Sequence, residues 1–284
     1  MAQRLLQEAT KAPARPRQRQ TIGWPQALRR ALPAAGYVVP PALALLLAGV
    51  VWELWVRIEE TPVYIVPRPT VVLDRWFGDL GFFAKEGSVT LMEAMGGFAL
   101  GSAVAIIAAI AMAHSRFVEK SFFPLAVLVK VTPIVAIAPL FAIWFGFGTM
   151  PKVLIAGLLA FFPVMVNGVV GFRSVNPGAL DFLRSLRASP WEIFWHLRVP
   201  SALPYLFASF RIAIPLAVIG AVVAEWFSGQ AGLGAVIIVA HSNLDMPTLF
   251  SAIVTLAIMG IVLTILTTVV ERRLVFWHES TLAQ

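Results

Sequence analysis

The sequence predicts an all-α, polytopic membrane protein with six transmembrane helices. Of its 284 residues, 59% are hydrophobic and only 13% are charged, a balance too apolar for a soluble domain of this length. Six apolar stretches reach the length of about 20 residues that a helix needs to cross a bilayer. Because the chain has no cysteine, disulfides and thiolate metal sites are excluded. The basic residues behind the net charge of +7 lie beside the spans and do not indicate a nucleic-acid partner.

The predicted spans follow one another with short connections. They cover residues 36–56, 87–113, 122–146, 151–172, 203–226 and 247–270. We expect a surface helix at 70–83 and a short re-entrant or surface helix within the glycine-rich stretch 227–246. Gly and Ala are frequent in the second span, which should let neighbouring helices approach closely. Prolines in spans 3, 4 and 5 should kink them; these are Pro124, Pro133, Pro139, Pro163 and Pro215.

The distribution of basic residues predicts the orientation of the chain. Residues 1–35 carry seven Lys or Arg against one acid, and residues 173–202 carry four Arg, whereas 225–247 carry neither Lys nor Arg. The positive-inside rule therefore places both termini and the 173–202 loop in the cytoplasm. We expect 1–35 to be a largely disordered cytoplasmic segment, 36–274 to be the six-span domain, and 275–284 to be a cytoplasmic tail.

The stretch 181–211 is the most amphipathic part of the chain between two spans. Ser189 is a good helix N-cap, Pro190 suits the first helical position, and Glu192 completes a capping box. We expect this helix to end just before Pro200, which cannot continue it. Its apolar side chains, which need either lipid headgroups or another protein as a partner, are Trp191, Phe194, Trp195 and Leu197.

This stretch resembles the cytoplasmic loop of permeases in binding-protein-dependent ABC importers. The signature of that family is Glu-Ala-Ala, three residues, Gly, nine residues and Ile-x-Leu-Pro. The corresponding register here starts at Asp181-Phe182-Leu183, has Arg187 at the position of the turn glycine, and ends with Leu197-Arg198-Val199-Pro200. The spacing and the final proline agree, whereas the alanines and the glycine are replaced. The alternative is an ordinary interfacial helix between two spans.

Further motifs extend the resemblance over residues 60–278. They are similar to those of permeases for aliphatic sulfonates, taurine, nitrate, riboflavin and thiamine-precursor pyrimidines. The sequence Arg-Ser-Leu-Arg-Ala-Ser at residues 184–189 resembles the pyrimidine and riboflavin branch more than the sulfonate branch. The motifs are Pro67-Arg68-Pro69-Thr70, Lys130-Val131-Thr132-Pro133, Ala138-Pro139-Leu140, Trp144-Phe145-Gly146, Phe162-Pro163 with Asn167, Ala224-Glu225, and Gly232-Leu233-Gly234.

The resemblance implies a type I ABC importer permease fold in a bacterial inner membrane. It implies two ATP-binding subunits, an extracytoplasmic substrate-binding protein and a second permease copy as partners. ATP and Mg would bind the ATPase, no cofactor is expected on this chain, and the sequence holds no G-x-x-x-x-G-K-[ST] pattern or catalytic cluster. The loop that couples to the ATPase would use Asp181, Arg184, Arg187, Ser189, Trp191, Glu192, Phe194, Leu197 and Pro200.

Candidates for the translocation path or gate are Lys130, Pro133, Asn167 and Glu225. Lys130 is a cation in an uncharged stretch, where it either faces a polar path or snorkels toward the cytoplasm. Asn167 could equally make an interhelical hydrogen bond, and Glu225 could equally mark the outer end of span 5.

Three further charged residues have less specific interpretations. We expect Glu93 near the outer end of span 2, at the interface rather than buried, and Lys152 in the outer turn at 146–152. Arg211 is expected either as a cytoplasmic anchor or in a structural salt bridge. A secondary transporter driven by ion gradients is the rival function. It would need ionisable residues at mid-membrane and an inverted repeat, of which the sequence offers only Lys130.

Overall fold

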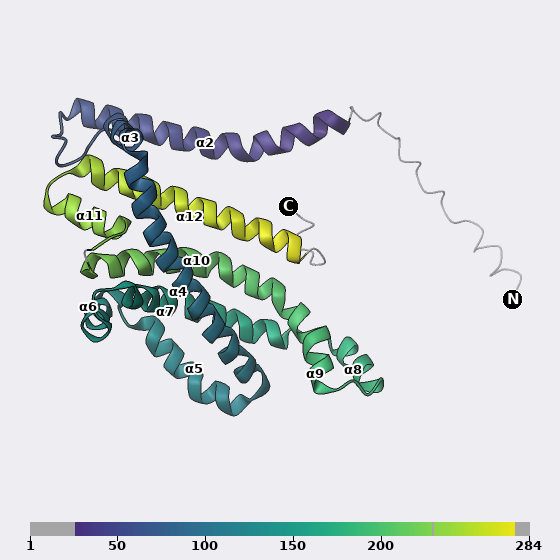
Figure 1. Cartoon of the computed structure of the whole chain (residues 1–284). Coiled ribbons are helices and arrows are strands. Elements are labelled where there is room, and N and C mark those ends of the chain that lie inside the picture. The colour runs from purple at the N-terminus through teal and green to yellow at the C-terminus, as the bar shows by residue number, and fades with distance from the viewer. Residues whose placement is uncertain (1–25, 229, 276–284) are drawn as a thin grey trace, which may run out of the picture. The chain divides into compact units, whose positions relative to one another are not determined.

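The computed structural model describes residues 26–228 and 230–275, and every regular element within them is a helix (Figure 1). Of the segment 1–35, which is predicted to be largely disordered, residues 1–25 lie outside the described residues, as does nearly all of the predicted tail at 275–284, whereas residues 26–35 are helical. The chain divides into two compact units, residues 1–52 and 53–284. Helix α2 (Gln26–Ile58) contains the first predicted span and begins ten residues before it.

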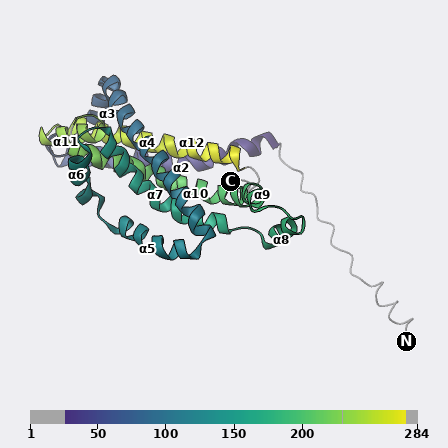
Figure 2. The ribbon, with the colours of Figure 1, turned by 60° about the horizontal axis from the view of Figure 1, so that its bottom comes forward.

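The second unit is built on four long helices, with shorter helices at both of its ends. The long helices are α4 (Leu80–His114), α7 (Thr149–Arg173), α10 (Val199–Ser228) and α12 (Met246–Leu274). One end carries α3 (Pro69–Gly78) and α11 (Leu233–Ser242), and the opposite end carries α8 (Pro177–Ser185) and α9 (Pro190–Ile193), as both views show (Figures 1 and 2). The predicted inner loop and the predicted outer helix therefore lie at opposite ends of the spans.

The described residues contain five helices that are long and apolar enough to cross a membrane. A sixth span results if α5 (Arg116–Val131) and α6 (Ile134–Phe145) count as one, although they meet at a bend of 97°. The predicted span at 122–146 is therefore broken rather than continuous. Pro133 explains the break, because it lacks an N–H group and disfavours a helical conformation in the residue before it. Thr132 accordingly has extended backbone angles, with φ −73° and ψ 126°.

Small residues allow close packing between α4 and α7, as the composition of the second span predicts. A Cβ atom on Gly97 would lie 2.7 Å from the Val153 carbonyl oxygen, and one on Gly101 would collide with the backbone of Gly157. The core shared by α4, α7 and α10 is likewise rich in small side chains; it includes Ala105, Ala109, Ala156, Ala160, Val164, Met165, Ala213, Ala217 and Ala221. Dispersion contacts and close approach, rather than large side chains, therefore hold these helices together.

The helix boundaries before the second span differ from those expected. The surface helix predicted at 70–83 ends at Gly78, and α4 begins at Leu80 rather than at residue 87. Asp79 sets this boundary, because its carboxylate accepts a hydrogen bond at 3.2 Å from the Phe82 N–H group and so caps α4.

Candidate functional site

The loop at 173–202 folds into two short helices, α8 and α9, with a tight turn between them. The predicted capping box at the start of α9 is present in both directions. The Glu192 N–H group donates to Ser189 Oγ at 3.3 Å, and the Ser189 N–H group donates to Glu192 Oε2 at 2.7 Å. The beginning of α9 is therefore fixed by hydrogen bonds that its own sequence supplies.

Arg187 occupies the left-handed backbone region at the turn, with φ 58°. Two hydrogen bonds close this turn in the Schellman pattern: the Ala188 N–H group donates to the Leu183 carbonyl at 3.0 Å, and the Arg187 N–H group donates to the Arg184 carbonyl at 2.9 Å. Arg187 thus adopts the conformation for which the family signature uses glycine. Arg184 also pairs with Asp181 at 3.6 Å, but both side chains are exposed and the pair contributes little to stability.

The prediction that the helix ends before Pro200 is wrong. A π-helical turn, η1 (Phe194–Arg198), follows α9, and α10 starts at Val199 and continues through Pro200 into the span. The wider π turn changes the hydrogen-bond register just where the proline lacks a donor. Ser201 Oγ then donates to the Leu197 carbonyl at 2.7 Å. As a result, the exposed helix α9 and the membrane span α10 form one continuous helical element.

The apolar side chains of this element face two directions. Trp191 and Trp195 are 68% and 49% exposed, whereas Phe194 and Leu197 are half-buried. The Phe194 ring stacks on Phe172 of α7, with centroids 6.0 Å apart, and therefore packs against another span of the same chain. The two tryptophans are therefore the most exposed of these apolar side chains.

A cavity of about 410 Å³ lies beside the break between α5 and α6. Two of the predicted path residues, Lys130 and Asn167, line it together with Phe162. The Lys130 ammonium nitrogen lies 4.6 Å from the centroid of the Phe162 ring, in a cation–π contact. Asn167 Nδ2 donates to the Pro163 carbonyl of its own helix at 2.9 Å, not to a neighbouring helix. Pro133 produces the break at which the cavity forms, although it is not among the lining residues.

This cavity, called the central pocket below, lies at the middle of the spans. Its lining residues on α7 fall between 158 and 167, and those on α10 are Ile212 and Leu216, so both sets surround the midpoints of their helices. Lys130 therefore contacts side chains at mid-span, which favours the interpretation as a path residue over snorkelling.

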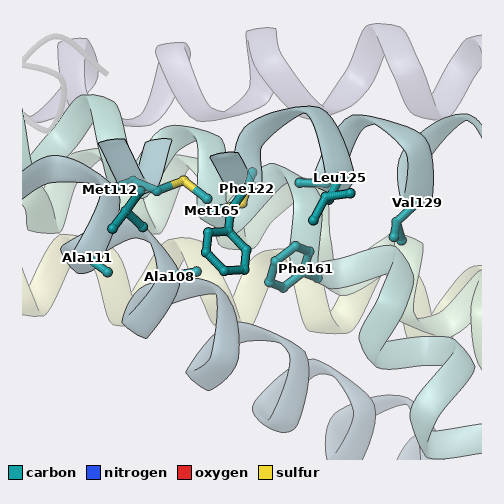
Figure 3. Close-up of a pocket in the computed structure, with 10 residues that line it drawn as sticks. Ala108, Ala111, Met112, Phe122, Leu125, Val129, Phe161 and Met165 are labelled. Carbon is teal, nitrogen blue, oxygen red and sulfur yellow. The ribbon is translucent and has the colours of Figure 1, made fainter. Parts of the chain in front are cut away.

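A second cavity of about 340 Å³ lies between α4, α5 and α7 (Figure 3). All of the side chains that line it are apolar, including Met112, Phe122 and Met165. Without a polar group to orient a solute, it does not have the character of a recognition site. The central pocket is therefore the better candidate for a solute site.

Glu225 lies outside the central pocket and is fully buried. Its carboxylate accepts hydrogen bonds from Thr90 Oγ1 at 2.7 Å and from the Gly234 N–H group at 2.5 Å. Thr90 Oγ1 in turn accepts a hydrogen bond from the Leu233 N–H group at 2.8 Å. The two motifs Ala224-Glu225 and Gly232-Leu233-Gly234 thus meet in space. Their contact holds the start of α11 against α10, and Thr90 holds it against α4. The sequence showed both motifs but not this connection.

The prediction that Glu93 is interfacial rather than buried is wrong, and Lys152, expected in the outer turn at 146–152, is buried beside it. These residues are 2% and 3% exposed, and Lys152 Nζ lies 2.8 Å from Glu93 Oε1. Lys152 Nζ also donates to the Ala231 carbonyl at 3.3 Å. Packing of α4 against α7 removes both charges from solvent, and their ion pair offsets part of the desolvation cost, with the Ala231 carbonyl as a second partner of Lys152. For Arg211, the expected alternative of a structural salt bridge is confirmed, because it pairs with Glu271 of α12.

Comparison with known proteins identifies relatives over most of the chain. Residues 101–276 match the family described as binding-protein-dependent transport system inner membrane component. The chain is 36% identical over 250 residues to the riboflavin transport system permease protein RibX of Chloroflexus aurantiacus, covering 87% of this chain and 92% of that protein. It is 35% identical over 223 residues to the formylaminopyrimidine transport permease protein ThiX of Halalkalibacterium halodurans, covering 78% and 88%. It is also 30% identical over 248 residues to the putative aliphatic sulfonates transport permease protein SsuC of Bacillus subtilis, covering 83% and 87%.

Proposed function

The chain belongs to the family of inner membrane components of binding-protein-dependent transport systems, and we propose that it is the permease subunit of an ATP-driven importer. One observation carries this proposal. The exposed helix α9 continues without interruption into α10, which supplies Ile212 and Leu216 to the central pocket. A single helical element thus connects a surface suited to docking with a cavity suited to a solute.

In the proposed mechanism, a separate ATPase subunit docks on α8 and α9 through Trp191 and Trp195. ATP and Mg bind that subunit, and its closure moves α9. Because α9 is continuous with α10 and Phe194 packs on Phe172, the movement reaches α7 and α10 at once. Transport follows if the inward-open and outward-open states differ in their affinity for ATP-bound ATPase and for solute.

The broken span offers an element that can move during this cycle. Arg173 of α7 binds Glu119 of α5 through two hydrogen bonds, at 2.9 and 2.8 Å, and so fixes one end of α5. The other end of α5 stops at Thr132, beside the central pocket. Helix α5 is thus held at one end by Arg173 and ends at the bend with α6. A gate segment can move in this way, because the angle between α5 and α6 can change without loss of hydrogen bonds within either helix.

We propose the same assembly that the family resemblance implies. It contains two ATP-binding subunits, two copies of this permease, and an extracytoplasmic binding protein that delivers the solute. The permease lies in the bacterial inner membrane with both termini in the cytoplasm, so α8 and α9 face the ATPase and α11 faces the binding protein.

For the solute, we propose a heterocyclic vitamin precursor of the riboflavin or pyrimidine type. The support is the higher identity to the permeases named for riboflavin and formylaminopyrimidine than to the one named for aliphatic sulfonates. A sulfonate of the same family is the alternative.

Uptake into proteoliposomes tests the proposed energy source. The purified permease is reconstituted with its ATPase and binding protein, and uptake of labelled riboflavin or formylaminopyrimidine is followed. Uptake should require hydrolysable ATP and should be insensitive to ionophores. Uptake that continues without ATP but is abolished by ionophores would instead establish the rival secondary transporter.

A further inference from the structure

The central pocket has an unusual balance of chemical groups for a site in the middle of a membrane protein. Its polar lining residues are Lys130, Thr132 and Asn167, and the others are apolar. Among the described residues that line it, none is acidic. The pocket therefore carries one positive charge, one hydroxyl and one amide, and its remaining lining is apolar.

Lys130 has no acidic partner among the salt bridges of the described residues. Its ammonium group instead lies over the Phe162 ring at 4.6 Å. An ammonium group at mid-membrane is costly unless it is paired or hydrated, and a cation–π contact offsets only part of that cost. The three N–H donors of Lys130 thus remain available to an acceptor that enters the pocket.

The break between α5 and α6 adds further donors at the same place. Helix α6 starts at Ile134, which lines the pocket, and no side chain caps its N-terminus. The first N–H groups of a helix lack intrahelical partners and carry partial positive charge. Lys130 and the start of α6 therefore favour the same kind of group, an anion or a hydrogen-bond acceptor.

Phe162 favours a solute with a flat ring. It is the aromatic residue among those lining the pocket, and its face is already the surface on which Lys130 rests. A planar ring that takes the place of the Lys130 ammonium group on the Phe162 face would leave that group free to bind acceptors at the edge of the solute. An aliphatic anion would gain from the charge but not from the ring, and a cationic ring would be repelled by Lys130.

We propose that the central pocket is a mid-membrane binding site for a flat aromatic solute with anionic or acceptor groups along one edge. The inference rests on the proposed function and narrows its substrate class. Phe162 stacks on the solute, while Lys130 and Asn167 bind its edge. The permease would then contribute to solute recognition together with the binding protein, because its pocket would select solutes by their planarity and their charge.

Equilibrium binding to the full-length permease in lipid nanodiscs tests this assignment. The probes are riboflavin, which is flat and rich in acceptors, butanesulfonate, which is anionic without a ring, and thiamine, whose ring carries a positive charge. Riboflavin should bind best. Lys130→Met should weaken its binding by about tenfold or more, since a hydrogen bond to a charged group is lost, and Lys130→Arg should retain most of it. Phe162→Leu should weaken riboflavin binding but not butanesulfonate binding.

Matched controls come from the same helix and the same residue types. Lys120→Met removes a cation elsewhere on α5, and Phe122→Leu changes a ring of the apolar cavity, so both should leave binding unchanged. Equal binding of butanesulfonate and riboflavin, no measurable binding of any probe, or an unchanged affinity in Lys130→Met would overturn the inference.

The same preparations separate this inference from the proposed function, because each is also tested for co-purification of the ATPase. If the ATPase is retained but Lys130→Met has no effect on binding, only the pocket assignment fails. If Lys130-dependent binding of riboflavin is found but no ATPase associates, only the importer assignment fails.

Discussion

Phe194 lies almost parallel to Phe172, with ring centroids 6.0 Å apart and an angle of 15° between the ring planes. Phe172 is buried near the end of α7, and Phe194 begins the π turn between α9 and α10. His114, the last residue of α4, lies 6.1 Å from Phe194 on another side. One side chain thus connects the exposed helix α9 with the ends of two other spans.

Phe194→Ala should therefore uncouple transport from ATPase binding. Loss of the ring removes the stacking with Phe172 and the ring contacts with Trp191 and Trp195, while the two tryptophans remain in contact with each other. We expect uptake in proteoliposomes to fall by about fivefold, since aromatic contacts of this kind contribute about 1 kcal/mol beyond their buried area. Retention of the ATPase should fall less than uptake does, because both tryptophans are still present. Phe194→Leu, which keeps an apolar contact, serves as the control, and normal uptake in Phe194→Ala would contradict the role.

Arg187→Gly should stabilise the coupling loop. Arg187 has left-handed backbone angles, which cost a residue with a side chain about 1 kcal/mol. Glycine adopts the same angles without this cost. Limited proteolysis of the α8–α9 turn should slow in this variant. Arg184→Gly is the matched control, because its position is inside α8 and glycine there should destabilise the helix by about 1 kcal/mol. Equal sensitivity of the two variants would show that the turn does not have the described backbone.

Local sequence signals predicted the coupling loop well because its contacts are local. The capping box at Ser189 and the bend at Arg187 involve partners within five residues. Proline, which predicts the end of a helix, has opposite effects at two positions in this chain. Pro133 breaks its span, whereas Pro200 is accommodated, because a π turn precedes it and shifts the hydrogen-bond register. The sequence around Pro200 contains no local pattern that predicts this π turn.

The buried polar contacts could not be predicted from one sequence. Glu93 and Lys152 are 59 residues apart, and each stands near the end of a predicted span, where charges usually face water. Glu225 and Thr90 are 135 residues apart. Only the packing of α4 against α7 and α10 brings these groups together, and no local pattern encodes that packing. For the same reason, the joint presence of Lys130, Phe162 and Asn167 at one pocket emerged from the structure.

Thr90→Val should loosen the start of α11 while keeping the shape of the core. Valine removes the hydroxyl that donates to Glu225 and accepts from the Leu233 N–H group, and both buried groups are then left without that partner. We expect a loss of about 1–3 kcal/mol, seen as a lower thermal unfolding midpoint. Thr264→Val is the control, because that hydroxyl is exposed and bonds only to the Gly260 carbonyl of its own helix. Equal effects of the two substitutions would argue against the Glu225–Thr90 connection.

Single cysteines should reveal the orientation, since the chain has none of its own. Ser242 at the end of α11 and Ser185 at the end of α8 are exposed and lie at opposite ends of the spans (Figure 1). In intact cells, a membrane-impermeant maleimide should label Ser242→Cys, whereas Ser185→Cys should react only after permeabilisation. The reverse pattern would place the coupling loop outside and rule out docking of a cytoplasmic ATPase.

Binding of the ATPase to the surface formed by Trp191 and Trp195 is the most direct test of the importer assignment. The measurement is the affinity of the purified cognate ATPase for the detergent-solubilised permease. Trp191→Ala should weaken binding by about 30-fold, because an aromatic anchor in a desolvated interface typically contributes about 2 kcal/mol. Trp144→Ala is the control, since Trp144 is 66% exposed but lies on α6, outside the coupling loop. Loss of affinity in Trp191→Ala alone is the predicted result, and equal, undiminished binding by both variants would contradict the account.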